Sequence, residues 1–435
     1  MGRDLRVLII GKGAREHVIS EAYEKDENVG QIIVAPGNDL IVYRRKKEVI
    51  IDGDCSLRDP NSILSIAKKY KPDLVDVASD NAIGSGSVDL LKGQGFPVFA
   101  PNKRAARLEY DKIFAKSFMR GYLIPSAHFQ AFNDTNEGIA HARRIYSENP
   151  RKLMFVKAFG LCDGKGALDS SDLEEAILNI HRMSGFGESG RRFIIEDGLE
   201  GEELSLFVIS DGDSYKVISC AVDYKRLNDS DKGPQTGGMG SFSPIDLSKT
   251  SKESIDLILE GTFGGFKKSD IIYKGILYFG LIKTPEGLRL IEYNARWGDP
   301  EAQVVLPGIS NYLEVVESCI AGNLGSVDIK SDSKSRVCVV GASKGYPNDH
   351  SKVDGKEIFG LEEIMRLPGV SVYGAGVKIM DGRFYADGGR LFSVVGKGDN
   401  LTDAGNISYD AIERTRIDSQ NLHFRTDVGY ASHML

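Results

Sequence analysis

The sequence predicts a multidomain α/β protein that begins with a doubly wound parallel sheet. Its 435 residues exceed the usual size of one domain, about 100 to 200 residues, so we expect about three domains. Hydrophobic residues make up 41% and charged residues 27% of the chain, which is ordinary for a globular protein. Near the N-terminus, short apolar runs alternate with helical patterns, and this alternation is typical of a parallel sheet covered by helices.

The composition also argues against several classes of partner. The net charge is -7 and the chain lacks a basic stripe, so we expect no nucleic acid partner. Neither a run of about 18 apolar residues nor a secretory pattern is present, so we expect no membrane partner. The five cysteines are widely spaced without a CxxC pair, which disfavours a disulfide framework and a zinc ribbon. We therefore expect a cytoplasmic protein that acts on small molecules.

The first domain is expected over residues 1–103. The apolar run Leu5 to Ile10 predicts a strand, and it is followed by a glycine loop and by a helical pattern that continues to Tyr23. Further strands are expected at 31–35, 48–51, 74–78 and 97–100, and further helices at 60–70 and 87–95.

Ligands of such sheets bind beyond the carboxyl ends of the strands, so the loops there should share one pocket. These loops are Gly11 to Arg15, Pro36 to Asn38 and Ala78 to Asp80. The first of them lacks the third glycine of a dinucleotide fingerprint, because Glu16 stands in its place. The loop therefore favours a phosphate ester over a nicotinamide cofactor, and an ordinary strand-to-helix turn is the alternative.

A small inserted unit is expected over residues 125–192. It combines a helix at 137–146, a strand at 153–158, a glycine-rich turn and a helix at 172–183. The turn, Gly160 to Gly166, is not a Walker A loop, because only three residues separate its first glycines and Gly166 follows Lys165. Lys157 and Lys165 are candidate cations for a polyphosphate, and a hairpin with solvated lysines is the alternative.

Oxygen-bearing side chains follow on the next predicted strands. An acidic cluster at 197–203 precedes a strand at 204–209, and fixed oxygens there suit an adenine amino group and ribose hydroxyls. On a later strand, 288–294, Glu292 and Asn294 are two residues apart and share a face. Such hard donors suit Mg²⁺ beside phosphates, whereas a solvated acidic cluster and an exposed strand face are the alternatives.

A glycine-rich polar segment lies between these strands. Lys225 and Arg226 are candidates for binding a carboxylate or phosphate, and the glycines of Thr236 to Gly240 let backbone N–H groups approach an anion. A last α+β unit is expected from residue 326. Its strands are expected at 336–341, 371–377, 383–386 and 391–396, and its helix at 403–416.

Together these motifs resemble the phosphoribosylamine–glycine ligase family of the ATP-grasp superfamily, over nearly the whole chain. The resemblance rests on Gly11 to His17 (family GxGGREH), Pro36 to Asn38, Val156 to Ala158, Gly164 to Gly166, Leu199 to Glu203, Gly233 to Gly240 (family GPNTGGMG), Glu292 to Val305 (family EFNCRFGDPETQVV), Ser343 to Pro347 and Arg425 to Gly429. It implies an ATP-grasp domain over 104–325 that contains a lid subdomain at about 125–192, a smaller C-terminal domain over 326–435, and a monomer or homodimer.

The resemblance also implies a reaction in purine biosynthesis. ATP, glycine and 5-phosphoribosylamine would give ADP, phosphate and glycinamide ribonucleotide through a glycyl phosphate. The implied ATP-binding residues are Lys157, Gly164, Lys165, Gly166, Glu196, Leu199 and Glu203, and the implied ligands of Mg²⁺ or Mn²⁺ are Glu292 and Asn294. The implied substrate-binding residues are Gly13, Arg15, Glu16, Asn38, Asp223, Lys225 and Arg296, of which Asp223 and Arg296, together with Lys165, are expected to act in catalysis.

Several positions depart from the family pattern. They are Ala14 in place of glycine, Ala78 to Asp80 in place of Gly-Pro-Glu, Cys162 and Asp163 in place of small residues, Tyr224 in place of histidine, and Gln235 in place of asparagine. Two alternatives therefore stay open, an ATP-grasp ligase for a different amine and a nucleotide-binding homologue without turnover. The presence of both Glu292 and Asn294 favours an enzyme, because a mere binder has less need of a metal pair.

Overall fold

A computed structural model describes residues 3–162, 166–245, 252–418 and 421–430. Its N-terminal part is a parallel sheet, as predicted, and the strands lie in the order β3-β2-β1-β4-β5. The strands are apolar runs, and β1 and β4 at its centre are almost wholly buried, as expected when helices cover both faces. The bounds are β1 Leu5–Gly11, β2 Val29–Pro36, β3 Glu48–Ile51, β4 Leu74–Val77, β5 Val98–Phe99, α1 Ala14–Glu24, α2 Pro60–Tyr70, α3 Asp80–Ser85 and α4 Ser87–Gly93.

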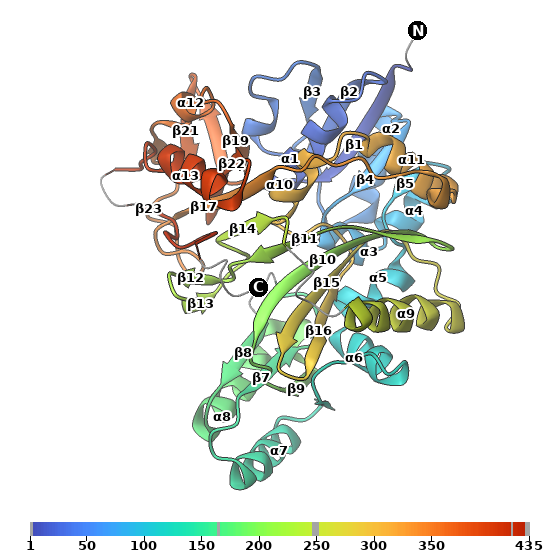
Figure 1. The fold of residues 1–435 in the computed structure, drawn as a ribbon, viewed down its shortest axis with the longest axis vertical. Helices are drawn as coiled ribbons and strands as arrows, with labels where there is room; N and C mark the ends of the chain where they lie inside the picture. Colours follow the sequence, from blue (N-terminus) through green and yellow to red (C-terminus); the bar gives the residue numbers. More distant parts are fainter. Residues whose placement is uncertain (1–2, 163–165, 246–251, 419–420, 431–435) are drawn as a thin grey trace.

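The inserted unit projects from the rest of the molecule, at the lower end of Figure 1. Its antiparallel sheet has the order β6-β9-β7-β8, and its own small apolar cluster packs under two helices. The strand β9 lies beyond the expected end of this unit at residue 192, yet it pairs with β6 and β7 and so belongs to the same sheet. The bounds are β6 Phe129–Phe132, α7 Thr135–Glu148, β7 Met154–Ala158, β8 Ala167–Ser170, α8 Leu173–Arg182 and β9 Phe193–Asp197.

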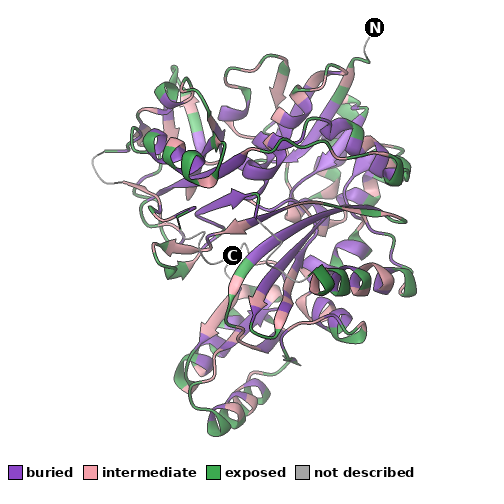
Figure 2. Ribbon diagram, viewed as in Figure 1, coloured by how far each residue is buried: buried purple, intermediate pink, exposed green. Residues whose placement is uncertain are grey.

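The central and C-terminal parts of the chain share one sheet, in the order β16-β15-β10-β11-β14-β17-β22-β19. The junction is the antiparallel pairing of β14 with β17, which runs from Gly240 opposite Val339 to Ser243 opposite Arg336. Figure 2 shows this sheet, of which β10, β15, β17 and β22 are buried along most of their length. The bounds are β10 Glu202–Asp211, β11 Tyr215–Asp223, β14 Gly240–Ser243, β15 Lys274–Thr284, β16 Gly287–Asn294, β17 Ser335–Ser343, β19 Val370–Gly374, β22 Arg390–Gly398 and, beside β17, β23 Leu422–His423.

Smaller elements complete the fold. The segment between β11 and β14 forms a short hairpin of β12 Arg226–Asn228 and β13 Lys232–Gln235, where the sequence predicted an irregular loop. A small sheet of β18 Glu357–Ile358, β20 Val377–Met380 and β21 Arg383–Ala386 lies in the C-terminal part. The remaining helices are α5 Lys103–Tyr110, α6 Lys112–Gly121, α9 Lys252–Lys268, α10 Ala302–Val305, α11 Tyr312–Ala321, α12 Leu361–Ile364 and α13 Leu401–Ile412.

The helix α9 was not expected from the sequence. Gly261, Gly264 and Gly265 lie within it, and glycine lowers intrinsic helix propensity by about 1 kcal/mol per residue. Packing explains Gly265, because a Cβ atom there would lie 2.7 Å from the ring of Phe118 and 2.8 Å from that of Tyr122. Close contact with α6 therefore outweighs the local preference of the chain.

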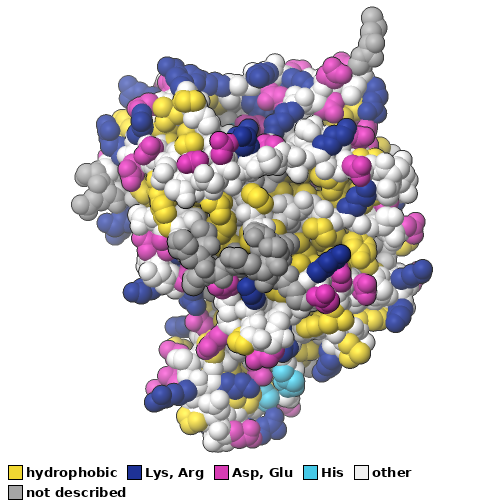
Figure 3. Space-filling model, viewed as in Figure 1, with side chains coloured by type: hydrophobic (Ala, Val, Ile, Leu, Met, Phe, Trp, Pro, Cys, Tyr) yellow, Lys and Arg dark blue, Asp and Glu magenta, His cyan; other side chains and the backbone are white. Residues whose placement is uncertain are grey.

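The described part of the chain contains no helix that is both long and apolar enough to cross a bilayer. The face seen in Figure 3 carries Lys and Arg side chains interspersed with Asp and Glu side chains. This mixture gives that face no extended region of one sign.

Candidate active site

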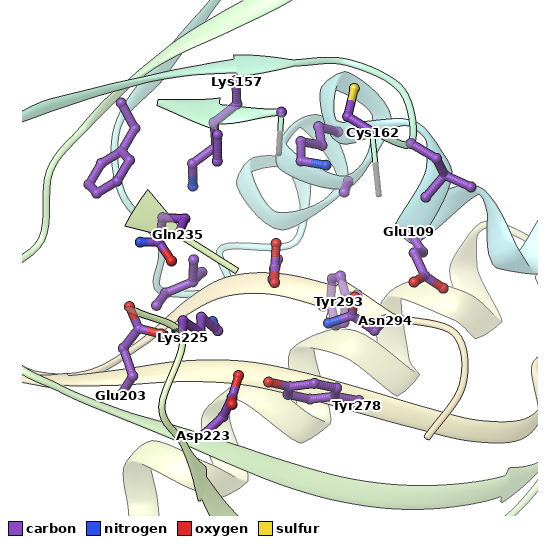
Figure 4. Close-up of a pocket in the computed structure, with 18 of the residues that line it drawn as sticks. Glu109, Lys157, Cys162, Glu203, Asp223, Lys225, Gln235, Tyr278, Tyr293 and Asn294 are labelled. Atoms are coloured by element: carbon purple, nitrogen blue, oxygen red, sulfur yellow. Dashed lines mark hydrogen bonds and ion pairs between the residues drawn. The ribbon is translucent and has the colours of Figure 1, made fainter. Parts of the chain in front are cut away.

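A cavity of about 470 Å³ lies where the inserted unit meets the shared sheet and the N-terminal loops. Figure 4 shows Lys157 of β7 on one wall and Lys225, Asp223 and Asn294 on the opposite wall. Charged residues from all three parts of the chain line it. They include Arg15, Asp80, Glu109, Lys112, Lys116, Lys157, Glu196, Glu203, Asp223, Lys225, Glu292, Arg296, Asp299, Glu301 and Arg390.

Two buried lysines flank one glutamate on the wall nearest the inserted unit. The Lys157 Nζ atom lies 2.7 Å from the Glu196 carboxylate, and the Lys116 ammonium contacts the other carboxylate oxygen. Burial alone would raise the pKa of Glu196, but Lys157 and Lys116 outweigh it and hold that pKa below its usual value. Burial lowers the pKa of Lys116, and the contact with Glu196 opposes this shift. The group has a net positive charge, which suits a polyphosphate.

The role of Lys116 was not predicted from the sequence, although a signal existed. Lys112 and Lys116 are four residues apart on α6, so they share one helix face, and both line the cavity. The predicted Gly166 and Leu199 also line it. Gly164 and Lys165 lie outside the described residues.

The predicted metal ligands project from β16 into the same cavity as Lys157. Burial would raise the pKa of Glu292, but Lys225, Lys112 and Lys157 outweigh it and lower that pKa to about 2. Glu292 is therefore ionised at neutral pH. The Asn294 Oδ1 atom accepts a hydrogen bond of 3.2 Å from Arg296 and retains a second lone pair. Two hard oxygen donors on one strand, one of them charged, fit a divalent cation.

Asp223 and Lys225 lie at the end of β11 and line the facing wall. The Lys225 Nζ atom lies 2.8 Å from the Glu203 carboxylate. The Asp223 Oδ1 atom is buried and has no hydrogen-bond partner among the described residues. Burial, reinforced by the charge of Glu301, raises the pKa of Asp223 well above its usual value. An unpaired carboxyl group of this kind suits a cationic ligand.

Arginines from three parts of the chain also reach the cavity. Arg296 forms an ion pair of 2.9 Å with Glu109, and its Nε atom is buried with no partner among the described residues. Arg390, at the start of β22, donates to the Gly237 carbonyl over 2.7 Å and to the Asp299 carboxylate over 2.8 Å. Arg15 donates to the Trp297 carbonyl over 3.2 Å. Arg390 was not predicted, because only tertiary pairing brings β22 to this site.

Three predicted substrate-binding residues, Gly13, Glu16 and Asn38, are not among the described residues that line the cavity. The Glu16 carboxylate instead accepts hydrogen bonds from the Gly13 N–H over 2.6 Å and from Arg15 over 2.7 Å. The Asn38 amide donates to the carbonyls of Lys12 over 2.7 Å and Gly374 over 2.8 Å. The Glu16 side chain therefore stabilises the glycine loop, and the Asn38 side chain joins this loop to β19.

The structure also places the positions that depart from the family pattern. Ala14 opens α1 and does not have a positive φ, so its methyl group causes no backbone strain. Asp80, Cys162 and Gln235 line the cavity, whereas Asp163 lies outside the described residues. Tyr224 is buried beside the C-terminal segment of the chain.

Family models and a full-length relative match this chain. The models of phosphoribosylglycinamide synthetase match in order, with the N domain over residues 5–109, the ATP-grasp (A) domain over 110–302 and the C domain over 336–431. A phosphoribosylamine–glycine ligase of Caldanaerobacter subterraneus is 36% identical over 98% of this chain and 99% of its own length. The chain therefore belongs to the phosphoribosylamine–glycine ligase family. The resemblance predicted from its motifs is thereby confirmed.

Solved structures agree with this membership. The crystal structure of phosphoribosylamine–glycine ligase from Thermotoga maritima is 28% identical, covers 97% of this chain and 100% of that one, and has a TM-score of 0.79. The biotin carboxylase domain of 2-oxoglutarate carboxylase from Hydrogenobacter thermophilus, solved with MgADP, ADP and bicarbonate, is 16% identical over 98% of this chain and 92% of that one. Its TM-score is 0.69. The second likeness shows the fold alone, and it agrees with an ATP-grasp architecture.

Proposed function

We propose that this chain carries out the reaction of its family, in which ATP drives the joining of glycine to 5-phosphoribosylamine in purine biosynthesis. The observation that carries the proposal is one cavity that combines lysines for a polyphosphate, oxygen donors for a metal and an unpaired Asp223 for a cation. The products are glycinamide ribonucleotide, ADP and phosphate. Glycyl phosphate is the intermediate.

ATP is expected on the wall formed by the inserted unit. Lys116 and Lys157 would bind the phosphates, and loss of their contacts with Glu196 would be compensated by the new charge-assisted bonds. Glu196, Leu199 and Glu203 would contact the nucleoside, since all three line the cavity. The separate apolar cluster of the inserted unit lets it move as one body, so we expect it to close as a lid and exclude water from the acyl phosphate.

Glu292 and Asn294 are the proposed ligands of Mg²⁺ or Mn²⁺, and their ionised and neutral oxygens fit such an ion. When bound, the ion would neutralise charge on the phosphates. The charge of Lys225 lowers the pKa of Glu292, and its ammonium group forms an ion pair with Glu203. Lys225 therefore connects the proposed metal site with the proposed ribose site.

Glycine is a zwitterion, and among the described residues that line the cavity one oxygen of Asp223 and the Nε atom of Arg296 lack a hydrogen-bond partner. The Asp223 carboxylate would bind the ammonium group, and the Arg296 Nε–H would bind the carboxylate. A glycine carboxylate oxygen then attacks the γ-phosphorus and ADP leaves. The amine of phosphoribosylamine attacks the acyl carbon, the C–O bond to phosphate breaks, and the amine proton is lost. The protein contributes chiefly position and charge neutralisation to both steps.

The second candidate is an ATP-grasp ligase with a different amine substrate. Asp80 and Gln235 favour it, because both depart from the family pattern and both line the cavity. It keeps the same ATP chemistry and glycine site. The two candidates therefore differ only in which amine stimulates turnover.

A coupled assay tests the proposal, with phosphoribosylamine generated in situ and each reactant omitted in turn. We expect ADP release to require ATP, glycine and phosphoribosylamine together. ADP release that ignores phosphoribosylamine but responds to another amine would favour the second candidate. Binding of ATP without turnover under any of these conditions would contradict both.

A further inference from the structure

A C-terminal segment backs the loop that carries Asp223 and Lys225. We call residues 423–429 the clamp and residues 223–237 the substrate loop. Arg425, at the centre of the clamp, has a side chain with 0% exposure. Its guanidinium donates to both oxygens of Asp427 over 2.7 Å and to the Asp231 carboxylate over 2.8 Å. It also donates to the Arg226 carbonyl over 3.1 Å, so it binds the substrate loop at two points.

Tyr224 is the aromatic partner of this arginine. The Arg425 guanidinium carbon lies 4.6 Å from the centre of the Tyr224 ring, within the range of a cation–π interaction. The Tyr224 hydroxyl accepts a hydrogen bond of 3.1 Å from the Gly429 N–H. Tyrosine replaces the usual histidine of the family at this position, and here it supplies both a ring and a hydroxyl to the clamp.

Further hydrogen bonds join the clamp and the loop along their length. The Thr426 N–H donates to the Asp229 carboxylate over 2.8 Å, and the Ser230 N–H donates to the Asp427 carboxylate over 2.8 Å. The His423 ring and the Leu227 carbonyl are 2.9 Å apart. Inside the loop, the hairpin is paired at Arg226–Gln235 and Asn228–Lys232, and the Thr236 N–H donates to the Lys225 carbonyl over 2.8 Å. The clamp therefore adds a second set of contacts to those that the loop makes with itself.

The clamp is itself anchored in the C-terminal core. The Tyr409 hydroxyl of α13 donates to the Arg425 carbonyl over 3.1 Å and accepts from the Val428 N–H over 2.9 Å. Val428 is fully buried against Gly240, where a Cβ atom would approach its side chain to 2.6 Å. Movement of the clamp would therefore disturb this core.

The clamp also fixes the directions of the side chains on either side of Tyr224, because side chains alternate along an extended segment. Successive side chains of an extended segment point to opposite faces. Tyr224 faces the clamp, where its ring lies against Arg425. Its neighbours Asp223 and Lys225 line the cavity, and Figure 4 shows both of them there. Gln235, Thr236 and Gly237 line the cavity from the other end of the loop. Fixing Tyr224 therefore fixes the two charged groups beside it.

We propose that Arg425 is a positioning residue, which holds the substrate loop against the clamp so that Asp223 and Lys225 are correctly placed for glycine and the amine. The effect on the reaction rests on the proposed function, whereas the effect on the loop does not. Arg425 is not among the described residues that line the cavity, so its proposed effect on the ligands is indirect. Its loss should impair the substrate side of the cavity and spare the ATP side.

The test is R425Q in the full chain, with R414Q as the matched control. Arg414 is an exposed arginine of the same C-terminal unit, and its ion pair of 3.1 Å joins it to Glu363. We expect kcat/KM for glycine to fall by about 100-fold in R425Q, since small misplacements of reacting groups have effects of this size. The Kd for ATP should stay within about threefold, and R425K should recover part of the loss.

Hydrogen exchange gives a readout that does not depend on the reaction. Backbone amides at 226–237 should exchange faster in R425Q than in the wild type, whereas those of β7 and β9 should not change. Wild-type protein without turnover would contradict the proposed function, yet the exchange comparison would still test the clamp. Unchanged exchange and unchanged glycine kinetics in R425Q would overturn the proposal, as would equal losses for glycine and ATP.

Y224F provides the test if R425Q does not fold. It keeps the ring beside Arg425 and removes only the acceptor of the Gly429 N–H. We expect a three- to tenfold increase in KM for glycine with little change in the Kd for ATP, about the effect of losing one hydrogen bond. A glycine KM equal to that of the wild type, with unchanged exchange at 226–237, would overturn the proposal.

Discussion

The two facing walls of the cavity are built in different ways. The ATP wall comes mainly from one small unit, where Lys157 and Glu196 lie on neighbouring strands of a single sheet and Lys116 reaches them from α6. The opposite wall is assembled from distant parts of the chain, because Asp223, Arg296 and Arg390 come from three separate strands or loops. The proposed ATP site is therefore formed mainly by one unit, whereas the proposed substrate site depends on how the three parts of the molecule dock.

Substitution at Glu292 should have the largest effect, because Glu292 is a proposed metal ligand and its charge interacts with both Lys157 and Lys225. In E292Q the charged oxygen donor is lost, and we expect kcat to fall by about 100- to 1000-fold while circular dichroism shows an unchanged fold. E286Q is the matched control, since Glu286 lies exposed in the turn of the same hairpin. Full activity of E292Q would remove the metal assignment.

D223N should affect the use of glycine but not the binding of ATP. Removing the charge takes away the proposed ammonium ligand, so we expect kcat/KM for glycine to fall by about 100-fold with an unchanged Kd for ATP. Because an unpaired buried carboxylate is costly, the same variant should be more stable by about 1–3 kcal/mol at neutral pH, measured by chemical unfolding. A variant that loses stability and binds ATP poorly would contradict this division.

The same aspartate predicts a pH dependence. Its folded-state pKa is raised, so the carboxyl is neutral below that pKa and becomes a ligand for a cation only as pH rises through it. We therefore expect kcat/KM for glycine to rise with pH above the ordinary range of an aspartate. In D223N this limb of the pH profile should disappear.

K116M should weaken the ATP wall alone. The variant keeps much of the buried apolar stem but removes the ammonium that contacts Glu196. We expect the Kd for ATP to rise about tenfold, as measured by calorimetry, whereas the KM for glycine should stay within about twofold. K112M is the comparison, because Lys112 lies on the same helix face. An equal rise in the Kd for ATP in K112M would contradict a specific role of Lys116 in binding the phosphates.

N38A should have the smallest effect on chemistry. Its amide bonds the glycine loop to β19, so we expect a loss of stability of about 1–2 kcal/mol and a change in kcat/KM below about twofold. A large increase in KM for phosphoribosylamine without loss of stability would instead support the substrate role predicted from the sequence.

The difference between the two walls of the cavity also explains which features could be predicted from the sequence. In the N-terminal sheet the strands are short, mostly apolar runs separated by polar segments, and β3 and α2 were predicted with their observed bounds. Lys157, Glu196 and Glu203 were named from motifs that carry the family resemblance, and all three line the cavity. The position of Arg390 follows from docking, for which no local pattern exists. By contrast, the bond from the Gly13 N–H to Glu16 is a local capping contact at the start of α1, between residues three apart, and the sequence analysis did not identify it.

The pairing of β14 with β17 likewise could not be predicted from either segment. Both strands have apolar positions that would suit separate sheets, and about ninety residues separate them along the chain. The domain boundary expected near residue 325 therefore crosses a continuous ladder of hydrogen bonds. The hydrogen-bonded sheet therefore continues across this expected boundary.

This continuous ladder has a consequence for how the protein is made. While the chain emerges from the ribosome, β14 is complete long before β17 is available to cover its free edge. During that interval the nascent protein presents unsatisfied backbone groups that can pair with another chain. Truncated forms that stop before β17 would keep this unpaired edge permanently. The part of the chain from β17 onward therefore protects the rest of the molecule from self-association and also completes the cavity through Arg390.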